Sequence, residues 1–236
     1  MACTAGCHWA AFIVTNEVHL YGSRVTRAPE AKIRVQGIHS CSIAPGRAPY
    51  KVGAYIPGGK NGEPAFARLF TFEALADISP EIQPIGQATF MRCDTVSWLW
   101  SGNGKAVIVR ADTDRDAKGQ SYYGESGLYY MTGTGKENQS IHLDKKGPIH
   151  DIQWAPSGRD FIAIYGFVPG KATLFGEKCK PKFEFGSVAH NTVIWSPHGR
   201  FVCLAGFGSL NGDMDFWDMN KLKKMGSANS RPEPYR

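Results

Sequence analysis

The sequence predicts an all-β fold, and three observations carry this prediction. Short apolar runs bounded by turn residues recur along the whole chain, and no long stretch shows the 3.6-residue period of an amphipathic helix. The chain also contains 27 Gly and 14 Pro, which suit many short strands joined by tight turns. With 236 residues, 42% of them apolar, it can bury a sizeable core as one large β domain or two ordinary ones.

One pattern occurs twice in succession between Ile149 and Asp218. Each copy has an alternating strand that ends in Trp, a Pro-x-Gly turn, a second apolar strand, a loop, and a third short strand that closes on an aromatic residue. Pro presets φ at the start of such a turn, and Gly supplies the positive φ that its exit often needs. Each copy is therefore predicted to be a hairpin-rich sheet. Its anchors are Trp154 and Gly158 in the first copy, and Trp195, Gly199 and Trp217 in the second.

Three earlier segments fit the same unit. Residues 1–37 contain three short strands, so the first strand of their unit is missing or lies in the first few residues. Residues 38–72 start a second unit, in which Ile43 takes the place of the Trp. Residues 95–143 form a third, whose anchors Trp100 and Gly104 repeat the Trp-x3-Gly spacing. The extra length of this third unit carries Asp112, Asp114 and Asp116, but it lacks the Gly and Glu of a calcium loop and is interpreted as a solvated insertion.

The anchor Trp residues are 54 and 41 positions apart. A repeat of this length with several strands is typical of β-propeller blades, here WD-repeat-like. We expect about four to five blades in an incomplete ring over residues 1–225, with residues 226–236 as a disordered basic tail that contains two prolines. A ring that does not close leaves exposed edges, so we expect low stability of this chain alone. The recurring Trp residues are interpreted as core packing between sheets rather than as a base-stacking platform.

The formal net charge of +6 gives a weak indication of nucleic-acid contact, because much of it lies in residues 221–236. Other lysines surround the two copies of the repeat. On strands and hairpin tips they could form a face for ribosomal RNA, although ordinary solvated lysines explain them almost as well. The candidates are Lys145, Lys146, Lys171, Lys178, Lys180, Lys182, Lys221, Lys223 and Lys224.

Other functional classes have little support in the sequence. The six cysteines have no disulfide-framework or zinc-finger spacing, so we expect reduced intracellular thiols and no metal or cofactor. No apolar run reaches the ~18 residues of a membrane span, which predicts no membrane partner. No nucleophile, metalloprotease or dinucleotide motif occurs, which argues against an enzyme.

Several longer strings resemble the eukaryotic translation initiation factor 2A family. The resemblance is strong over residues 95–224 and looser over residues 1–91. The propeller subunit of initiation factor 3 is the nearest relative with which the family can be confused. The strings are residues 121–125, 165–175, 179–186 and 204–208, followed by 216–218.

The resemblance implies a cytoplasmic, non-enzymatic factor whose N-terminal propeller docks on the small ribosomal subunit and supports GTP-independent delivery of initiator methionyl-tRNA. It also implies contacts with mRNA, tRNA and other initiation factors through a basic C-terminal region that this sequence does not contain. From about Gly226 the sequence departs from the family, which predicts a truncated form. The alternatives are a generic WD-type scaffold for protein partners and the related subunit of initiation factor 3.

Overall fold

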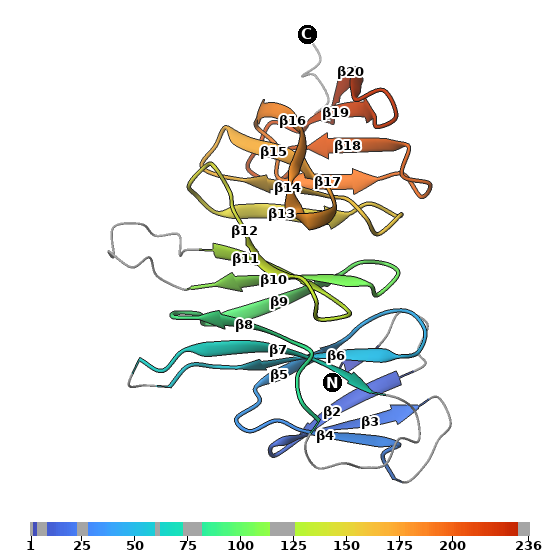
Figure 1. Cartoon of the computed structure of the whole chain (residues 1–236). Coiled ribbons are helices and arrows are strands. Elements are labelled where there is room, and N and C mark those ends of the chain that lie inside the picture. The colour runs from blue at the N-terminus through green and yellow to red at the C-terminus, as the bar shows by residue number, and fades with distance from the viewer. Residues whose placement is uncertain are drawn as a thin grey trace. The chain divides into compact units, whose positions relative to one another are not determined.

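The computed structural model describes residues 2–3, 9–22, 28–59, 62–72, 82–113 and 126–230. These residues form twenty strands in five antiparallel sheets of four strands each, which confirms the all-β prediction (Figure 1). In every sheet the strands lie side by side in chain order, so each sheet is a meander built from three hairpin connections. The sheets divide between two compact units, one containing β1–β12 and the other β13–β20.

The first unit holds three sheets. Its first sheet has a short leading strand, β1, so the missing strand of the first repeat does lie in the first few residues. The strands are β1 (Ala2–Cys3), β2 (Trp9–Val14), β3 (Glu17–Gly22) and β4 (Ala31–Arg34); β5 (Ser40–Ile43), β6 (Tyr50–Ile56), β7 (Ala65–Phe72) and β8 (Gly86–Phe90); and β9 (Thr95–Trp100), β10 (Ala106–Asp112), β11 (Ser126–Thr132) and β12 (Asn138–Ile141).

The second unit holds the two copies of the repeat as two sheets. A 3₁₀ turn at Glu177–Cys179 connects the last two strands of the first of them. The strands are β13 (Ile149–Trp154), β14 (Phe161–Tyr165), β15 (Gly170–Phe175) and β16 (Pro181–Val188), and then β17 (Thr192–Trp195), β18 (Phe201–Ala205), β19 (Asp213–Asp218) and β20 (Lys223–Asn229).

The expected boundary of the tail differs from the structure. Strand β20 crosses the predicted start at Gly226 and pairs with β19 as far as Asn229 opposite Asp213. Glycine and small residues at 226–228 are typical of a linker in the sequence, but they lie on an edge strand, where no second neighbour demands a bulky side chain. Residues 231–236 lie outside the described residues, as do Asp114 and Asp116 of the acidic insertion.

The turn glycines adopt the predicted conformation. Gly104, Gly158 and Gly199 have φ of 65°, 68° and 71°. At Gly104 a side chain is also excluded by space, because a Cβ would lie 2.0 Å from the carbonyl oxygen of Pro45 in the neighbouring sheet. Each of these glycines therefore allows the chain to reverse. Gly104 also allows its turn to contact the turn that contains Pro45.

The anchor tryptophans are partly buried and pack against other apolar or aromatic side chains. In the first unit, Trp100 stacks on Trp98 at 6.2 Å and its indole N–H donates to Ser42 Oγ over 2.9 Å. In the second unit, Trp154 lies 5.3 Å from Phe161, and Trp217 meets Phe185 edge-on at 5.0 Å. Trp195 and Trp217 are partly buried and pack against the apolar cluster between the two sheets of that unit.

Candidate nucleic-acid interface

Four chain reversals of the second unit meet at one end of its two sheets. Antiparallel strands alternate in direction, so the β13–β14, β15–β16, β17–β18 and β19–β20 connections all lie at the same end. The two Pro-x-Gly turns touch there, since a Cβ on Gly199 would lie 3.3 Å from Cδ of Pro156.

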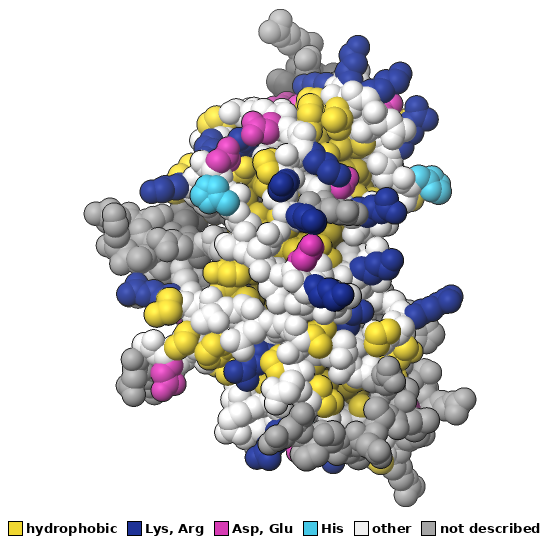
Figure 2. All heavy atoms as spheres, in the orientation of Figure 1, with side chains coloured by type: hydrophobic (Ala, Val, Ile, Leu, Met, Phe, Trp, Pro, Cys, Tyr) yellow, Lys and Arg dark blue, Asp and Glu magenta, His cyan; other side chains and the backbone are white. Residues whose placement is uncertain are grey.

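Basic side chains gather at this end, which we call the basic edge. Figure 2 shows Lys and Arg side chains projecting where the β19–β20 turn lies, at the upper right. Six of them come from the predicted lysines, and two are arginines that follow the turn glycines. The basic edge consists of Arg159, Lys178, Lys180, Lys182, Arg200, Lys221, Lys223 and Lys224.

Carboxylates neutralise part of the basic edge. Lys182 Nζ lies 2.6 Å from Asp160 Oδ1, and Lys224 Nζ lies 2.8 Å from Asp215 Oδ1. Burial alone would raise the pKa of Asp215, but the hydrogen bonds from Lys224 and Ser227 outweigh it and hold that pKa below its ordinary value. Asp215 thus stays charged near neutral pH, and Lys224 is a less available phosphate ligand than its exposure suggests.

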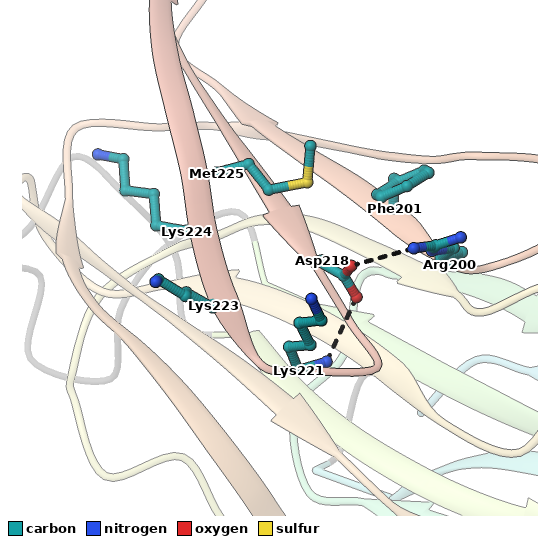
Figure 3. A pocket seen from close by; sticks show the side chains of 7 residues that line it. All are labelled: Arg200, Phe201, Asp218, Lys221, Lys223, Lys224 and Met225. Atoms are coloured by element: carbon teal, nitrogen blue, oxygen red, sulfur yellow. Dashed lines mark hydrogen bonds and ion pairs between the residues drawn. The ribbon is translucent and has the colours of Figure 1, made fainter.

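A shallow hollow of about 420 Å³ lies within the basic edge (Figure 3). Asp218 forms its floor, is 6% exposed, and accepts hydrogen bonds from the backbone N–H groups of Asn220 (2.9 Å) and Lys221 (3.3 Å). This carboxylate therefore fixes the β19–β20 turn that carries the lysines. The hollow is lined by Arg200, Phe201, Asp218, Lys221, Lys223, Lys224 and Met225.

The hollow combines cations with exposed apolar surface. The Arg200 guanidinium lies 4.9 Å from the centre of the Phe201 ring and 3.6 Å from Asp218 Oδ2, so it is held by a ring contact and a long ion pair. In Figure 3, Met225 points toward Phe201, whereas Lys223 and Lys224 extend to the other side of β20. Chemically, such a surface can bind phosphate groups through its cations and stack a base or aliphatic group on the ring.

The remaining predicted lysines lie elsewhere. Lys145 donates to the carbonyl oxygen of Pro169, and Lys171 forms ion pairs with Asp144 and with Glu184, the latter at 2.8 Å. Lys171 lies near the start of β15, a strand of six residues that spans roughly 17 Å and has its other end at the basic edge. Lys146 precedes β13 at the same end as Lys145 and is exposed. The structure therefore does not bring the nine predicted lysines together in one patch.

Lys171 belongs to a hydrogen-bonded network rather than to a free basic surface. Tyr165 is buried, and its hydroxyl lies 2.7 Å from Asp144 Oδ1 and 3.1 Å from Thr173 Oγ1. Burial raises the pKa of Tyr165 to about 12, and the carboxylates of Asp144 and Glu184 raise the pKa of Lys171. The network keeps this lysine charged but occupied, which indicates a structural role.

Arg200 and Phe201 were not among the residues predicted from the sequence. A usable signal was present, because Arg159 and Arg200 occupy the same place after the turn Gly in both copies of the repeat. Among the described residues, no group of three His, Cys, Asp or Glu side chains is placed to hold a metal ion. None of the described helical segments is long and apolar enough to cross a membrane.

Comparison with known proteins points to one family. Residues 88–232 match the family model described as eukaryotic translation initiation factor eIF2A. The chain is 36% identical over 215 residues to eukaryotic translation initiation factor 2A of Dictyostelium discoideum, covering 90% of this chain and 34% of the relative. It is 35% identical to the factor of the same name from Schizosaccharomyces pombe, covering 92% and 36%. The chain thus spans about a third of these relatives' length.

Solved structures show the same fold. A crystal structure described as that of the eukaryotic initiation factor matches with a TM-score of 0.80 and 32% identity, covering 97% of this chain and 52% of that chain. The Dos1 propeller matches with a TM-score of 0.53 at 14% identity, covering 96% of this chain and 57% of that chain, and supports the fold alone. The predicted β-propeller class is confirmed.

Proposed function

Because the chain belongs to the eukaryotic translation initiation factor 2A family, we propose that it acts in translation initiation as a non-enzymatic, cytoplasmic binding module. Its partner in this proposal is the small ribosomal subunit, which it contacts through ribosomal RNA. Support for GTP-independent delivery of initiator methionyl-tRNA is the wider activity in which this contact would take part, with mRNA, tRNA and other initiation factors as further partners.

The observation that carries the proposal is the basic edge of the second unit. Cations that neutralise backbone phosphates supply most of the sequence-independent affinity of proteins for nucleic acids. Lys221 and Lys223 are exposed and line the same hollow as Arg200 and Phe201, and the Asp218 carboxylate fixes the turn from which they project. A rigid turn carrying cations loses little conformational entropy when it binds a phosphate backbone.

Charge reversal tests this proposal. The double variant Lys221→Glu/Lys223→Glu of the 236-residue chain should weaken binding to purified small ribosomal subunits at least about tenfold in a sedimentation assay. Affinity should also fall less steeply with salt: the negative slope of log affinity against log salt should become shallower by about 1 to 2, since two phosphate contacts are lost. A matched control is Lys136→Glu/Lys146→Glu, which reverses the same number of exposed charges at residues that do not belong to the basic edge.

Three outcomes decide between this function and its rival. Wild-type binding that weakens steeply with salt, and that only the first double variant reduces, supports the proposal. An equal loss of binding in both double variants would indicate a general effect of charge and would show that the basic edge is not the binding surface. Binding that depends on neither salt nor the basic edge would favour a propeller scaffold for protein partners, because largely apolar interfaces respond weakly to ionic strength.

A further inference from the structure

The connection between β14 and β15 carries three consecutive exposed apolar residues, which we call the apolar tip. They are Phe167, Val168 and Pro169, and the first two are 50% and 55% exposed. Because antiparallel strands alternate in direction, the tip lies at the end of the second unit opposite to the basic edge (Figure 1). Chain reversals usually carry polar residues, glycine or proline. Adjacent exposed side chains as large as Phe and Val are instead typical of an interaction surface.

The apolar tip is exposed although the strand that leads to it is covered on both sides. All five residues of β14 are buried, so side chains on both faces of that strand are shielded from water. Gly166 and Gly170, which flank the tip, are buried as well. The exposure of Phe167 and Val168 therefore results from their place at the end of a hairpin and not from an uncovered sheet face.

Hydrogen bonds fix the backbone of the apolar tip. The Gly166 N–H donates to the carbonyl oxygen of Pro148 over 2.9 Å, and the Phe167 N–H donates to that of Lys146 over 3.3 Å. Between these two acceptors, Gly147 packs so closely that a Cβ on it would lie 2.4 Å from the Phe167 nitrogen. A tip held in this way loses little conformational entropy on binding, so burial of its side chains contributes fully to affinity.

The charges beside the apolar tip are not arranged to bind phosphate. Lys171 forms ion pairs with Asp144 and Glu184, whose side chains are 54% and 55% exposed. Lys145 donates to a carbonyl oxygen of the tip, whereas Lys146 is exposed. One exposed lysine beside two half-exposed carboxylates gives little net attraction for a phosphate backbone or an anionic lipid surface. The tip therefore suits an apolar protein surface.

We propose that the apolar tip inserts into an apolar pocket on a protein of the small ribosomal subunit. This inference rests on the proposed function and adds to it a second contact, with protein instead of RNA. Because the tip is a hairpin end with its side chains exposed, its complement is a concave surface, and aromatic side chains are enriched in the buried centres of protein interfaces. The two ends of the second unit thus contact RNA and protein of the same particle.

Sedimentation with purified small ribosomal subunits, and separately with the protein-free RNA extracted from them, tests the proposal. Phe167→Ser in the 236-residue chain should weaken binding to subunits at least about tenfold, because an aromatic anchor is lost. This factor should be the same at about 50 and 200 mM salt, and binding to the free RNA should not change. Lys221→Glu/Lys223→Glu should weaken binding to both.

Two further variants exclude an indirect effect of Phe167→Ser. Phe216→Ser is the matched control, since it removes a ring that is 39% exposed on β19 and is not part of the tip, and it should bind subunits like the wild type. Val168→Ser alters the tip at a second residue and should weaken binding to subunits about threefold or more. Circular dichroism and thermal midpoints identify any variant that is not folded.

The outcomes separate this contact from the proposed function. Folded tip variants that bind subunits like the wild type overturn the contact and leave the basic edge as the proposed binding surface. An equal loss of binding to the protein-free RNA would make the tip a base-stacking contact and overturn its assignment to protein. Wild-type chain that binds no subunits at all overturns the proposed function, and this contact with it.

Discussion

The two sheets of the second unit share one sequence pattern but differ in burial. Every residue of β14 is buried, whereas its counterpart β18 exposes Phe201 and buries Cys203 only partly. The outer strand β16 buries Phe185 and Val188, whereas all seven residues of β20 are exposed. Both sheets nevertheless have the same strand order, the same Trp position and the same left-handed Gly. The local sequence pattern thus determines where strands and turns form, whereas the burial of a side chain depends on what packs against its face of the sheet.

The largest expected effect comes from truncating one aromatic residue in each sheet. Phe161 is fully buried and stacks on Phe175 at 5.1 Å, so Phe161→Ala should lower the free energy of unfolding by about 3 to 5 kcal/mol. Phe216→Ala should cost under about 1 kcal/mol, because much of that ring already contacts water. Urea unfolding followed by circular dichroism measures both values. Equal losses would show that the second sheet is as tightly packed as the first.

A smaller effect is expected at the third residue before each anchor Trp. Asp151 Oδ1 accepts from the Ile152 N–H at 2.8 Å, and its Oδ2 accepts from the Val193 N–H at 2.7 Å, which joins β13 to β17. Asp151→Ala should therefore lower the free energy of unfolding by about 1.5 to 3 kcal/mol, because the buried Val193 N–H loses a charged acceptor.

The equivalent residue of the second sheet provides the control for Asp151. Among the described residues, the Thr192 hydroxyl donates to the adjacent Asn191 side chain, at 3.0 Å, and to no residue of the other sheet, so Thr192→Ala should change stability by about 0.5 kcal/mol or less. The same urea titration compares the two variants. If Thr192→Ala lowered the free energy of unfolding as much as Asp151→Ala, the hydrogen bond between Asp151 and Val193 would not explain the lost stability.

The sequence allowed the repeat to be predicted because its cues are local. Trp154 and Trp195 mark strand ends, and Gly158 and Gly199 require a positive φ that favours glycine. Strand β20 escaped prediction because its side chains are small or polar, and only pairing with β19 reveals it. An edge strand needs few apolar residues, so composition alone cannot separate it from a tail.

The candidate site was less predictable than the fold, since it depends on contacts between distant residues. Lysine spacing could not show that Lys171 is held by Asp144, which lies in the loop before β13, or that Lys182 is held by Asp160. Nor could it show that Arg200 approaches the β19–β20 turn, which antiparallel pairing brings to the same end of the sheet. Basic residues are visible in a sequence, but their counter-ions are not.

The smallest expected effect concerns the connection between the two sheets. His190 is 5% exposed, and its Nδ1 atom has no hydrogen-bond partner among the described residues. Burial lowers the pKa of His190, although Asp215 and Asp213 oppose the shift. Below the ordinary pKa of about 6.5, the unfolded chain therefore binds a proton at this residue that the folded chain does not.

Stability should consequently fall as the pH drops from 7 through the lowered pKa of His190. His190→Leu removes this group, and the equivalent position in the first sheet, Ile149, shows that the repeat accepts an aliphatic residue there. The variant should lose less stability than the wild type between pH 7 and about pH 5, measured by urea unfolding at several pH values. Asp215, whose pKa is lowered, loses its contribution only at more acidic pH, so it does not mask the histidine. Identical pH profiles for variant and wild type would show that His190 is protonated without cost and that this connection opens readily to water.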